Sequence, residues 1–346
     1  MDSVTQLALG AAVGEATLGR KAGNKAIGWG AICGTIPDLD VFIPFDDPVT
    51  SFISHRSFSH SLFTLALLTP CVVWIIRRLH PQLANHTRRW MTLVYLVFAT
   101  HALLDSFTAY GTQLFWPFSN HPIMWSTIFI IDPVYTTPLL LGVIGALIMS
   151  REKGLGHTVN TLGLILSTLY LSWTVIAKWH VTHFAQEQLT THQIHYTKML
   201  VQPTPINTLL WRILIMKEDG YAEGFYSIAR PSADLHLTHF PSDRYVLDTL
   251  TTHTPVEGLR WFTQGFWGIK QQDNFIVISD LRMGMEPHYA FSFNIGTNQQ
   301  ARIVPIAGTR RASTTNWGHV LSWVWKRIWN APDTLGSDGT TQRTHD

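Results

Sequence analysis

The sequence has few charged residues and almost no excess of either sign. Charged residues make up 14% of the 346 positions, and the formal net charge is +2. A nucleic-acid-binding surface usually needs a concentrated basic face, so nucleic acid is not an expected partner. Low charge together with 46% apolar residues predicts a membrane component instead.

Cysteine is nearly absent. Cys33 and Cys71 both lie in apolar stretches, which favours small buried side chains over a disulfide or a thiolate metal site. The N-terminus has no basic segment and no small-residue cleavage site, so a removable signal peptide is not expected. Insertion into a membrane would then depend on the helices themselves.

Apolar runs are abundant. A bilayer core needs roughly 20 mainly apolar helical residues, and all but the first run are reasonable candidates. We therefore predict an α-helical polytopic membrane bundle of about five or six helices. The first run is short, rich in alanine and glycine, and carries Glu15, so it is either a tightly packed helix or a re-entrant one. The runs cover residues 4–18, 26–36, 61–76, 91–107, 125–149 and 158–177.

Basic residues lie in alternate loops between these runs. Cytoplasmic loops carry an excess of Lys and Arg, so these loops are predicted to face the cytoplasm. Residues 37–60, residues 108–125 and the segment after residue 178 would then lie outside. The basic residues are Arg20, Lys21, Lys25, Arg77, Arg78, Arg88, Arg89, Arg151 and Lys153.

The chain changes in texture after residue 178. Residues 209–216 and 221–229 are strand-like runs separated by the turn sequence Lys-Glu-Asp-Gly, which predicts a hairpin. We predict a transmembrane helical domain over residues 1–178 and an extracytoplasmic α+β domain over residues 179–330. Residues 331–346 are polar and predicted to be disordered.

Metal-ligand side chains recur at the ends of the apolar runs. His101 and Asp105 share one helical face, because residues four apart point the same way. Histidines and carboxylates are the usual ligands of catalytic divalent metals. The alternative is that they are loop caps and interface residues that only happen to share a side. The predicted metal-binding residues are Asp38, Asp40, His55, His60, His101 and Asp105.

Three residues near His60 have other expected roles. Arg56 carries a planar, fixed cation that suits an anionic group on a substrate, or it anchors a helix end. Ser59 and Ser61 are both expected to cap the helix that follows them.

Five ordered segments in roughly the first 150 residues resemble the YdjM/YbcI family of inner-membrane metal-dependent hydrolases. They are Thr5-Gln6, Pro37-Asp38-Leu39-Asp40, residues 55–61 (HRSFSHS), residues 101–105 (HALLD) and Trp116-Pro117-Phe118-Ser119. Many members carry histidine where this chain has Gln6, so Gln6 and Glu15 are expected to support the ligands and not to bind metal.

The resemblance implies a multi-pass hydrolase of the bacterial inner membrane, with the metal site already predicted. Asp38, Asp40 and Arg56 are the expected catalytic residues, and zinc is the expected metal, with manganese or iron as alternatives. The expected partners are membrane lipid and an anionic or lipid-linked substrate, such as a phosphoester. A divalent-metal transporter or a non-catalytic membrane scaffold or regulatory protein is the alternative function.

Overall fold

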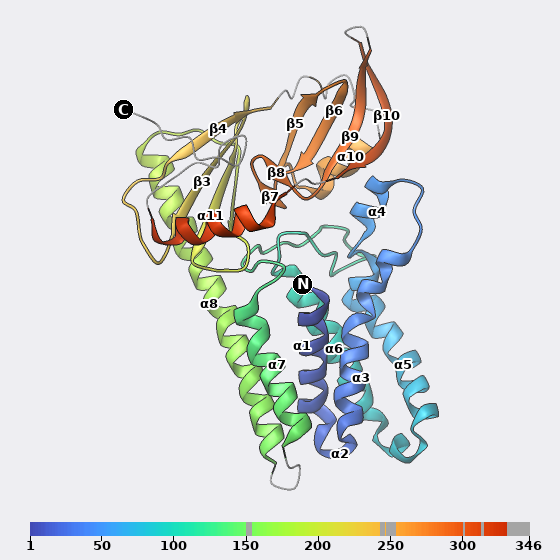
Figure 1. The fold of residues 1–346 in the computed structure, drawn as a ribbon. Helices are drawn as coiled ribbons and strands as arrows, with labels where there is room; N and C mark the ends of the chain where they lie inside the picture. The colour runs from blue at the N-terminus through green and yellow to red at the C-terminus, as the bar shows by residue number, and fades with distance from the viewer. Residues whose placement is uncertain (150–153, 243–245, 247–253, 300–301, 313–314, 331–346) are drawn as a thin grey trace. The chain divides into compact units, whose positions relative to one another are not determined.

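The computed structural model describes residues 1–149, 154–242, 246, 254–299, 302–312 and 315–330 (Figure 1). The chain divides into two compact units, which we describe separately. The first comprises Met1–Ile43 and His55–Val175, and the second comprises Pro44–Ser54 and the described residues from Ile176 onward. The tail predicted to be disordered, residues 331–346, lies outside the described residues.

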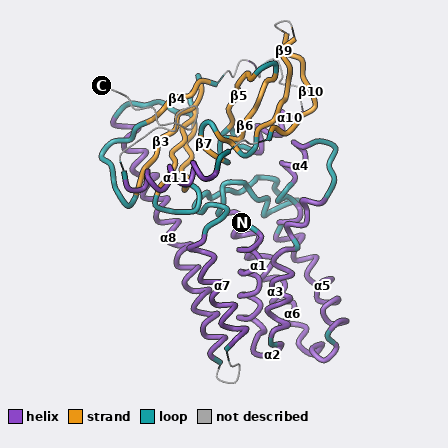
Figure 2. The backbone as a smooth tube through the Cα atoms, viewed as in Figure 1, coloured by secondary structure: helices purple, strands orange, loops and turns teal. Residues whose placement is uncertain are grey.

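The first unit is helical, and its long helices lie side by side (Figures 1 and 2). Three of them begin at the side-chain caps that helix starts favour. Asp2, Ser61 and Asp132 each accept hydrogen bonds from the first free backbone N–H groups of their helix. The helices are α1 Ser3–Gly14, α2 Arg20–Ala22, α3 Asn24–Thr35, α5 Leu62–Leu79, α6 Thr87–Ser106, α7 Pro133–Ile148 and the first part of α8 Leu155–Thr191.

The prediction of five or six membrane-spanning helices is wrong. Among the described residues, only α5 and α8 are long and apolar enough to cross a membrane. Helices α1 and α3 have 12 residues each and so are about 18 Å long, against a bilayer core of about 30 Å. Helix α7 is apolar but has 16 residues, and α6 includes two arginines, a histidine and an aspartate. The fold is an α+β arrangement of helices and sheets.

Glycines explain the close packing of α1 against α3. A β-carbon built on Gly10 would lie 2.3 Å from the carbonyl oxygen of Gly30, and one on Gly14 would lie 2.3 Å from that of Ala26. A β-carbon built on Gly34 would lie 2.5 Å from the carbonyl oxygen of Gln6. Each helix therefore presents two glycines four residues apart, the pattern that lets two helix backbones touch. This contact places the end of α3 beside the start of α1.

Replacing Gly30 with alanine is expected to destabilise the first unit. The new β-carbon would meet the Gly10 carbonyl oxygen at 2.2 Å, so the backbones must separate, at a cost of about 1–3 kcal/mol. Gly28→Ala is the matched control, because nothing lies within 4 Å of its added β-carbon. Thermal unfolding of both variants in one detergent is the measurement. Equal midpoints would contradict the close packing of α1 against α3.

The second unit contains two four-stranded antiparallel sheets. The predicted hairpin is confirmed, since β2 pairs with β3 across the turn after Met216. One sheet has the order β1-β2-β3-β4 and the other β10-β9-β6-β5, with a short β7-β8 hairpin. The strands are β1 Lys198–Pro203, β2 Leu210–Met216, β3 Gly220–Ser227, β4 Leu237–Pro241, β5 Trp267–Gln272, β6 Phe275–Asp280, β7 Gly284–Met285, β8 His288–Tyr289, β9 Ser292–Gln299 and β10 Arg302–Arg311.

Helices cover these sheets. The last part of α8 packs Val181, Ala185 and Leu189 against Trp211 and Ile213 of β2. Helix α11, Trp317–Trp329, packs on the same sheet through Val320 and Val324, while α4 Pro48–Ser54 lies against α10 Thr254–Phe262 and β10. Of the cysteines, Cys33 is buried as expected, whereas Cys71 is exposed on α5.

Candidate metal centre

Four helix ends meet at one end of the first unit. The chain alternates in direction, so the starts of α1 and α5 lie beside the ends of α3 and α6 (Figure 1). Asp38 lies in a 3₁₀ turn that follows α3, and His60 lies in a 3₁₀ turn that precedes α5. His101 and Asp105 lie one turn apart in the last part of α6. The topology therefore brings ligand-type side chains from three segments together.

Asp38, His60, His101 and Asp105 form a group that could hold one metal ion. His60 Nε2 lies 3.1 Å from Asp105 Oδ2, 3.2 Å from His101 Nε2 and 3.4 Å from Asp38 Oδ1. His101 Nε2 lies 3.6 Å from Asp38 Oδ1 and 3.7 Å from Asp105 Oδ2. Three of the four side chains are almost fully buried, and that of Asp38 is 21% exposed. The open side of the group is therefore the Asp38 side.

These separations fit a tetrahedral ion. Zinc binds nitrogen and oxygen ligands at about 2.0–2.1 Å, which places neighbouring tetrahedral ligand atoms about 3.3–3.4 Å apart. Octahedral magnesium, with bonds of similar length, would need adjacent ligands about 2.9 Å apart. The observed separations of 3.1–3.7 Å are closer to the tetrahedral value. Two histidines and two carboxylates are also a donor set that zinc accepts.

Both histidines are oriented by a partner on the other ring nitrogen. His101 Nδ1 lies 2.8 Å from the carbonyl oxygen of Gly34, so Nδ1 carries the proton and the Nε2 lone pair faces the group. His60 Nδ1 lies 2.9 Å from Ser59 Oγ, which in turn donates to Asp40 Oδ2 at 2.6 Å. Partners of this kind fix the tautomer and ring direction of metal-binding histidines.

Asp105 has one oxygen that is satisfied and one that is not. Oδ1 accepts hydrogen bonds from Gln6 Nε2 at 2.9 Å and from the amino group of Met1. Oδ2 is buried and accepts no well-directed hydrogen bond, although Arg56 Nε lies 3.1 Å away. A buried carboxylate oxygen without a hydrogen bond is costly. A cation bound between the histidines and Asp38 would satisfy it.

Asp40 and His55 lie beside the group of four side chains. Asp40 Oδ1 is 2.7 Å from His55 Nδ1, and Oδ2 accepts from the backbone N–H of Arg56 at 3.0 Å. The His55 side chain is 22% exposed, and its ring centroid is 5.9 Å from that of His60. The group that could hold one ion does not include these two residues. They form an acid–histidine pair beside it.

Arg56 is buried and held on several sides. Its guanidinium pairs with Asp105, donates from Nη1 to Thr108 Oγ1 at 3.1 Å, and lies 5.1 Å from the ring centroid of Tyr110. Its backbone adopts a φ of 62°, a conformation that costs non-glycine residues of order 1–3 kcal/mol. This turn directs Arg56 inward and its neighbour His55 toward Asp40. Arg56 compensates the charge of Asp105.

The loop between α6 and α7 fixes the His60 turn. Gln113 N–H donates to the Arg56 carbonyl at 2.9 Å, and Leu62 N–H donates to the Leu114 carbonyl at 3.0 Å. Ser61 Oγ donates to the Trp116 carbonyl at 2.5 Å and also caps α5. The turn that carries His60 is thus pinned on both sides.

The carboxylates are held in the charged form. Burial raises the pKa of Asp38, but the contacts with His101 and His60 together lower it by more than burial raises it. The pKa of Asp38 therefore lies below its ordinary value. Burial likewise raises the pKa of Asp40, and the hydrogen bond with His55 is the largest of the effects that bring it below the ordinary value. Ionised carboxylates are the form that binds metal.

The supporting residues agree only in part with the sequence prediction. Gln6 contacts Asp105, as expected of a supporting residue, whereas Glu15 lies in a π-helical turn, 3.6 Å from His157. Ser61 caps α5 as predicted, but Ser59 does not cap a helix and links Asp40 to His60. Its position between two candidate ligands is the signal in the sequence that could have indicated this.

Comparison with known proteins supports the resemblance seen in the motifs. The sequence model of the family described as YdjM inner membrane protein matches residues 1–181, slightly more than half of the chain. The chain belongs to this family. The family is one of inner membrane proteins. All four clustered side chains lie within the segment that matches the YdjM model.

A relative of this YdjM family member is the uncharacterized protein YfhP of Bacillus subtilis (strain 168). The two are 30% identical over 141 residues, which cover 38% of this chain and 42% of YfhP. The chain thus matches less than half the length of this curated relative. No solved structure matches the chain significantly.

Proposed function

We propose that this YdjM family member is a zinc-dependent hydrolase that acts at the extracytoplasmic surface of the bacterial inner membrane on a phosphoester or lipid-linked substrate. The observation that carries the proposal is the group of Asp38, His60, His101 and Asp105, with tetrahedral spacing and one open side. The membrane location is supported by membership of an inner membrane protein family, and the extracytoplasmic side is part of the proposal.

The four ligands would hold the ion, and the neighbouring residues supply the rest of the site. A bound divalent metal lowers the pKa of its water and polarises a substrate oxygen. His55, oriented by Asp40 through Nδ1, keeps Nε2 for exchanging a proton with substrate or leaving group. Arg56 balances the charge of Asp105, so the group presents less net negative charge to an anionic substrate.

The test is turnover by the purified full-length protein with chromogenic phosphomonoesters and phosphodiesters and a lipid phosphoester. Hydrolysis should disappear on chelation and return with zinc. His55→Ala should keep the metal and lower kcat by about 10²–10⁴, the usual contribution of an acid–base group. The exposed His121→Ala is the control and should match the unmodified protein.

A protein that binds zinc but hydrolyses none of these substrates would refute hydrolysis of them. The metal centre itself would survive that result. Loss of metal from the His55→Ala variant would instead show that His55 is a ligand and not the proton-exchanging residue.

A further inference from the structure

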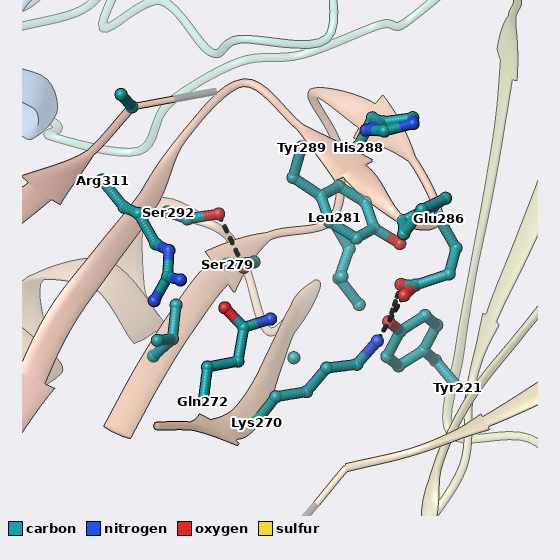
Figure 3. A pocket seen from close by; sticks show the side chains of 14 residues that line it. Tyr221, Lys270, Gln272, Ser279, Leu281, Glu286, His288, Tyr289, Ser292 and Arg311 are labelled. Carbon is teal, nitrogen blue, oxygen red and sulfur yellow. Dashed lines mark hydrogen bonds and ion pairs between the residues drawn. The ribbon is translucent and has the colours of Figure 1, made fainter. Parts of the chain in front are cut away.

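The second unit contains a polar pocket of about 230 Å³ (Figure 3). Its floor is one face of the sheet β5-β6-β9-β10, and its other walls come from the β7-β8 hairpin and from Tyr221 of β3. All of its lining residues belong to the second unit, so the pocket is separate from the metal centre. Its volume is below the roughly 300–1,000 Å³ of pockets for drug-sized ligands, which limits it to a small ligand.

One row of residues crosses all four strands of the floor. Arg311 of β10 pairs with Ser292 of β9, Ser292 pairs with Ser279 of β6, and Ser279 pairs with Gly268 of β5. Residues in such a row project from the same face of the sheet. At the Gly268 position the place of a fourth side chain is taken by Tyr221 and Leu281, which would lie 3.0 and 3.2 Å from an added β-carbon. The floor therefore offers a guanidinium and two hydroxyls from the other three strands.

Lys270 and Gln272 extend the same face along β5, since alternate residues of a strand share a side. In Figure 3 both side chains reach toward the middle of the pocket. The ammonium of Lys270 forms an ion pair with Glu286, which also accepts a hydrogen bond from Tyr221 at 2.5 Å. Glu286 thus lies opposite the floor and anchors the wall.

The wall is held by a buried network. Glu223 pairs with Arg212 and accepts hydrogen bonds from Tyr289 Oη at 2.7 Å and from the backbone N–H of Glu286 at 3.3 Å. Arg212 and Glu223 are both almost fully buried. The β7-β8 hairpin is therefore fixed over the floor by groups outside the pocket. A fixed polar pocket binds a ligand with less loss of conformational freedom.

The lining has an excess of positive charge and of donors. Glu286 is the single carboxylate of the lining and pairs with Lys270, whereas Arg311 lies 3.8 Å from Asp273, whose side chain is 84% exposed. Ser279 and Ser292 hydroxyls lie 2.8 Å apart, so one hydroxyl donates to the other and the second keeps its proton for a ligand. This arrangement is complementary to a tetrahedral oxyanion.

We propose that this pocket binds a small phosphate ester that also carries hydroxyl groups. Arg311, Lys270 and the paired serines bind the phosphate, and Glu286 with His288 accepts hydrogen bonds from the hydroxyl groups. Such a ligand is either a soluble polyol phosphate or the headgroup of a phospholipid.

The test uses full-length protein in nanodiscs of neutral lipid, titrated calorimetrically with glycerol 3-phosphate. Saturable binding is expected, with none for glycerol alone. Arg311→Gln should weaken binding by about tenfold or more, the usual effect of losing a charged hydrogen bond. Arg310→Gln is the matched control: it removes the same charge from the neighbouring position of β10, where the guanidinium lies over Phe291.

A second arm distinguishes the two sources. If phosphatidylglycerol nanodiscs abolish glycerol 3-phosphate binding, the lipid headgroup occupies the pocket; unchanged binding identifies the soluble ester. Ser279→Ala provides a further variant in case Arg311→Gln fails to fold. Equal binding by Arg311→Gln and Arg310→Gln, or equal binding of glycerol and its phosphate, would overturn the proposal.

Discussion

Replacing His101 with alanine is expected to abolish stoichiometric zinc binding. His101 Nε2 lies between His60, 3.2 Å away, and the two carboxylates, and its direction is fixed by the Gly34 carbonyl. Losing one of four ligands from a buried site removes both a bond and the oriented geometry. Changes to supporting residues alone typically lower metal affinity by 10–100-fold, so removal of a ligand should lower it by more than about 100-fold.

Metal content after dialysis, followed by titration against a competing chelator, measures this loss. Ser59→Ala removes only the bridge from Asp40 to His60. Its zinc affinity should therefore lie between those of the unmodified protein and of His101→Ala. His121→Ala should bind zinc normally, because His121 is exposed and outside the group. Metal content unchanged in His101→Ala would mean that the four side chains do not form a metal centre.

The local sequence pattern predicted the pair of side chains that lie in a single helix, His101 and Asp105. The spacing of His101 and Asp105 places both on one face of α6 wherever that helix lies. The prediction that Asp38 and His60 bind metal rested on a weaker pattern. Metal-ligand residue types recur at the ends of the helices. The sequence indicated that these ends share a side, because the helices alternate in direction, but it could not give a distance.

The sequence could not separate the four clustered side chains from the residues that lie beside them. Asp38 and Asp40 are two residues apart, yet only Asp38 belongs to the group. The 3₁₀ turn and the left-handed backbone at Arg56 decide this, because they direct Asp40 to His55, Ser59 and the Arg56 N–H. A left-handed conformation at an arginine cannot be predicted from the sequence, because non-glycine residues rarely adopt it.

The wrong number of spanning helices has a different cause. Apolar composition predicts exposure to lipid, but the first two runs form 12-residue helices that pack closely against each other through glycines. Composition cannot distinguish these two uses of an apolar residue. The glycine spacing could have indicated close packing between the two helices. Gly10 and Gly14 are four residues apart, as are Gly30 and Gly34.

Removing the carboxylate of Glu223 is expected to cause a large loss of stability in the second unit. Glu223→Ala leaves the guanidinium of Arg212 buried without its partner, and it removes the acceptor for Tyr289 Oη. Breaking a buried ion pair in this way typically costs about 3–5 kcal/mol. For a unit of this size that corresponds to a fall of about 10 °C in the unfolding midpoint.

Two further variants identify the cause of that loss. Glu218→Ala removes an equal charge from the exposed turn between β2 and β3 and should leave the midpoint within about 2 °C. Combining Arg212→Met with Glu223→Leu should recover part of the loss, because no unpaired charge is then buried. Recovery would be incomplete, since Arg212 Nη1 also donates to the Leu281 carbonyl at 2.6 Å and Tyr289 would still lack its acceptor. If Glu223→Ala unfolds at the same temperature as Glu218→Ala, water reaches Arg212 and the network is not the support of the β7-β8 hairpin.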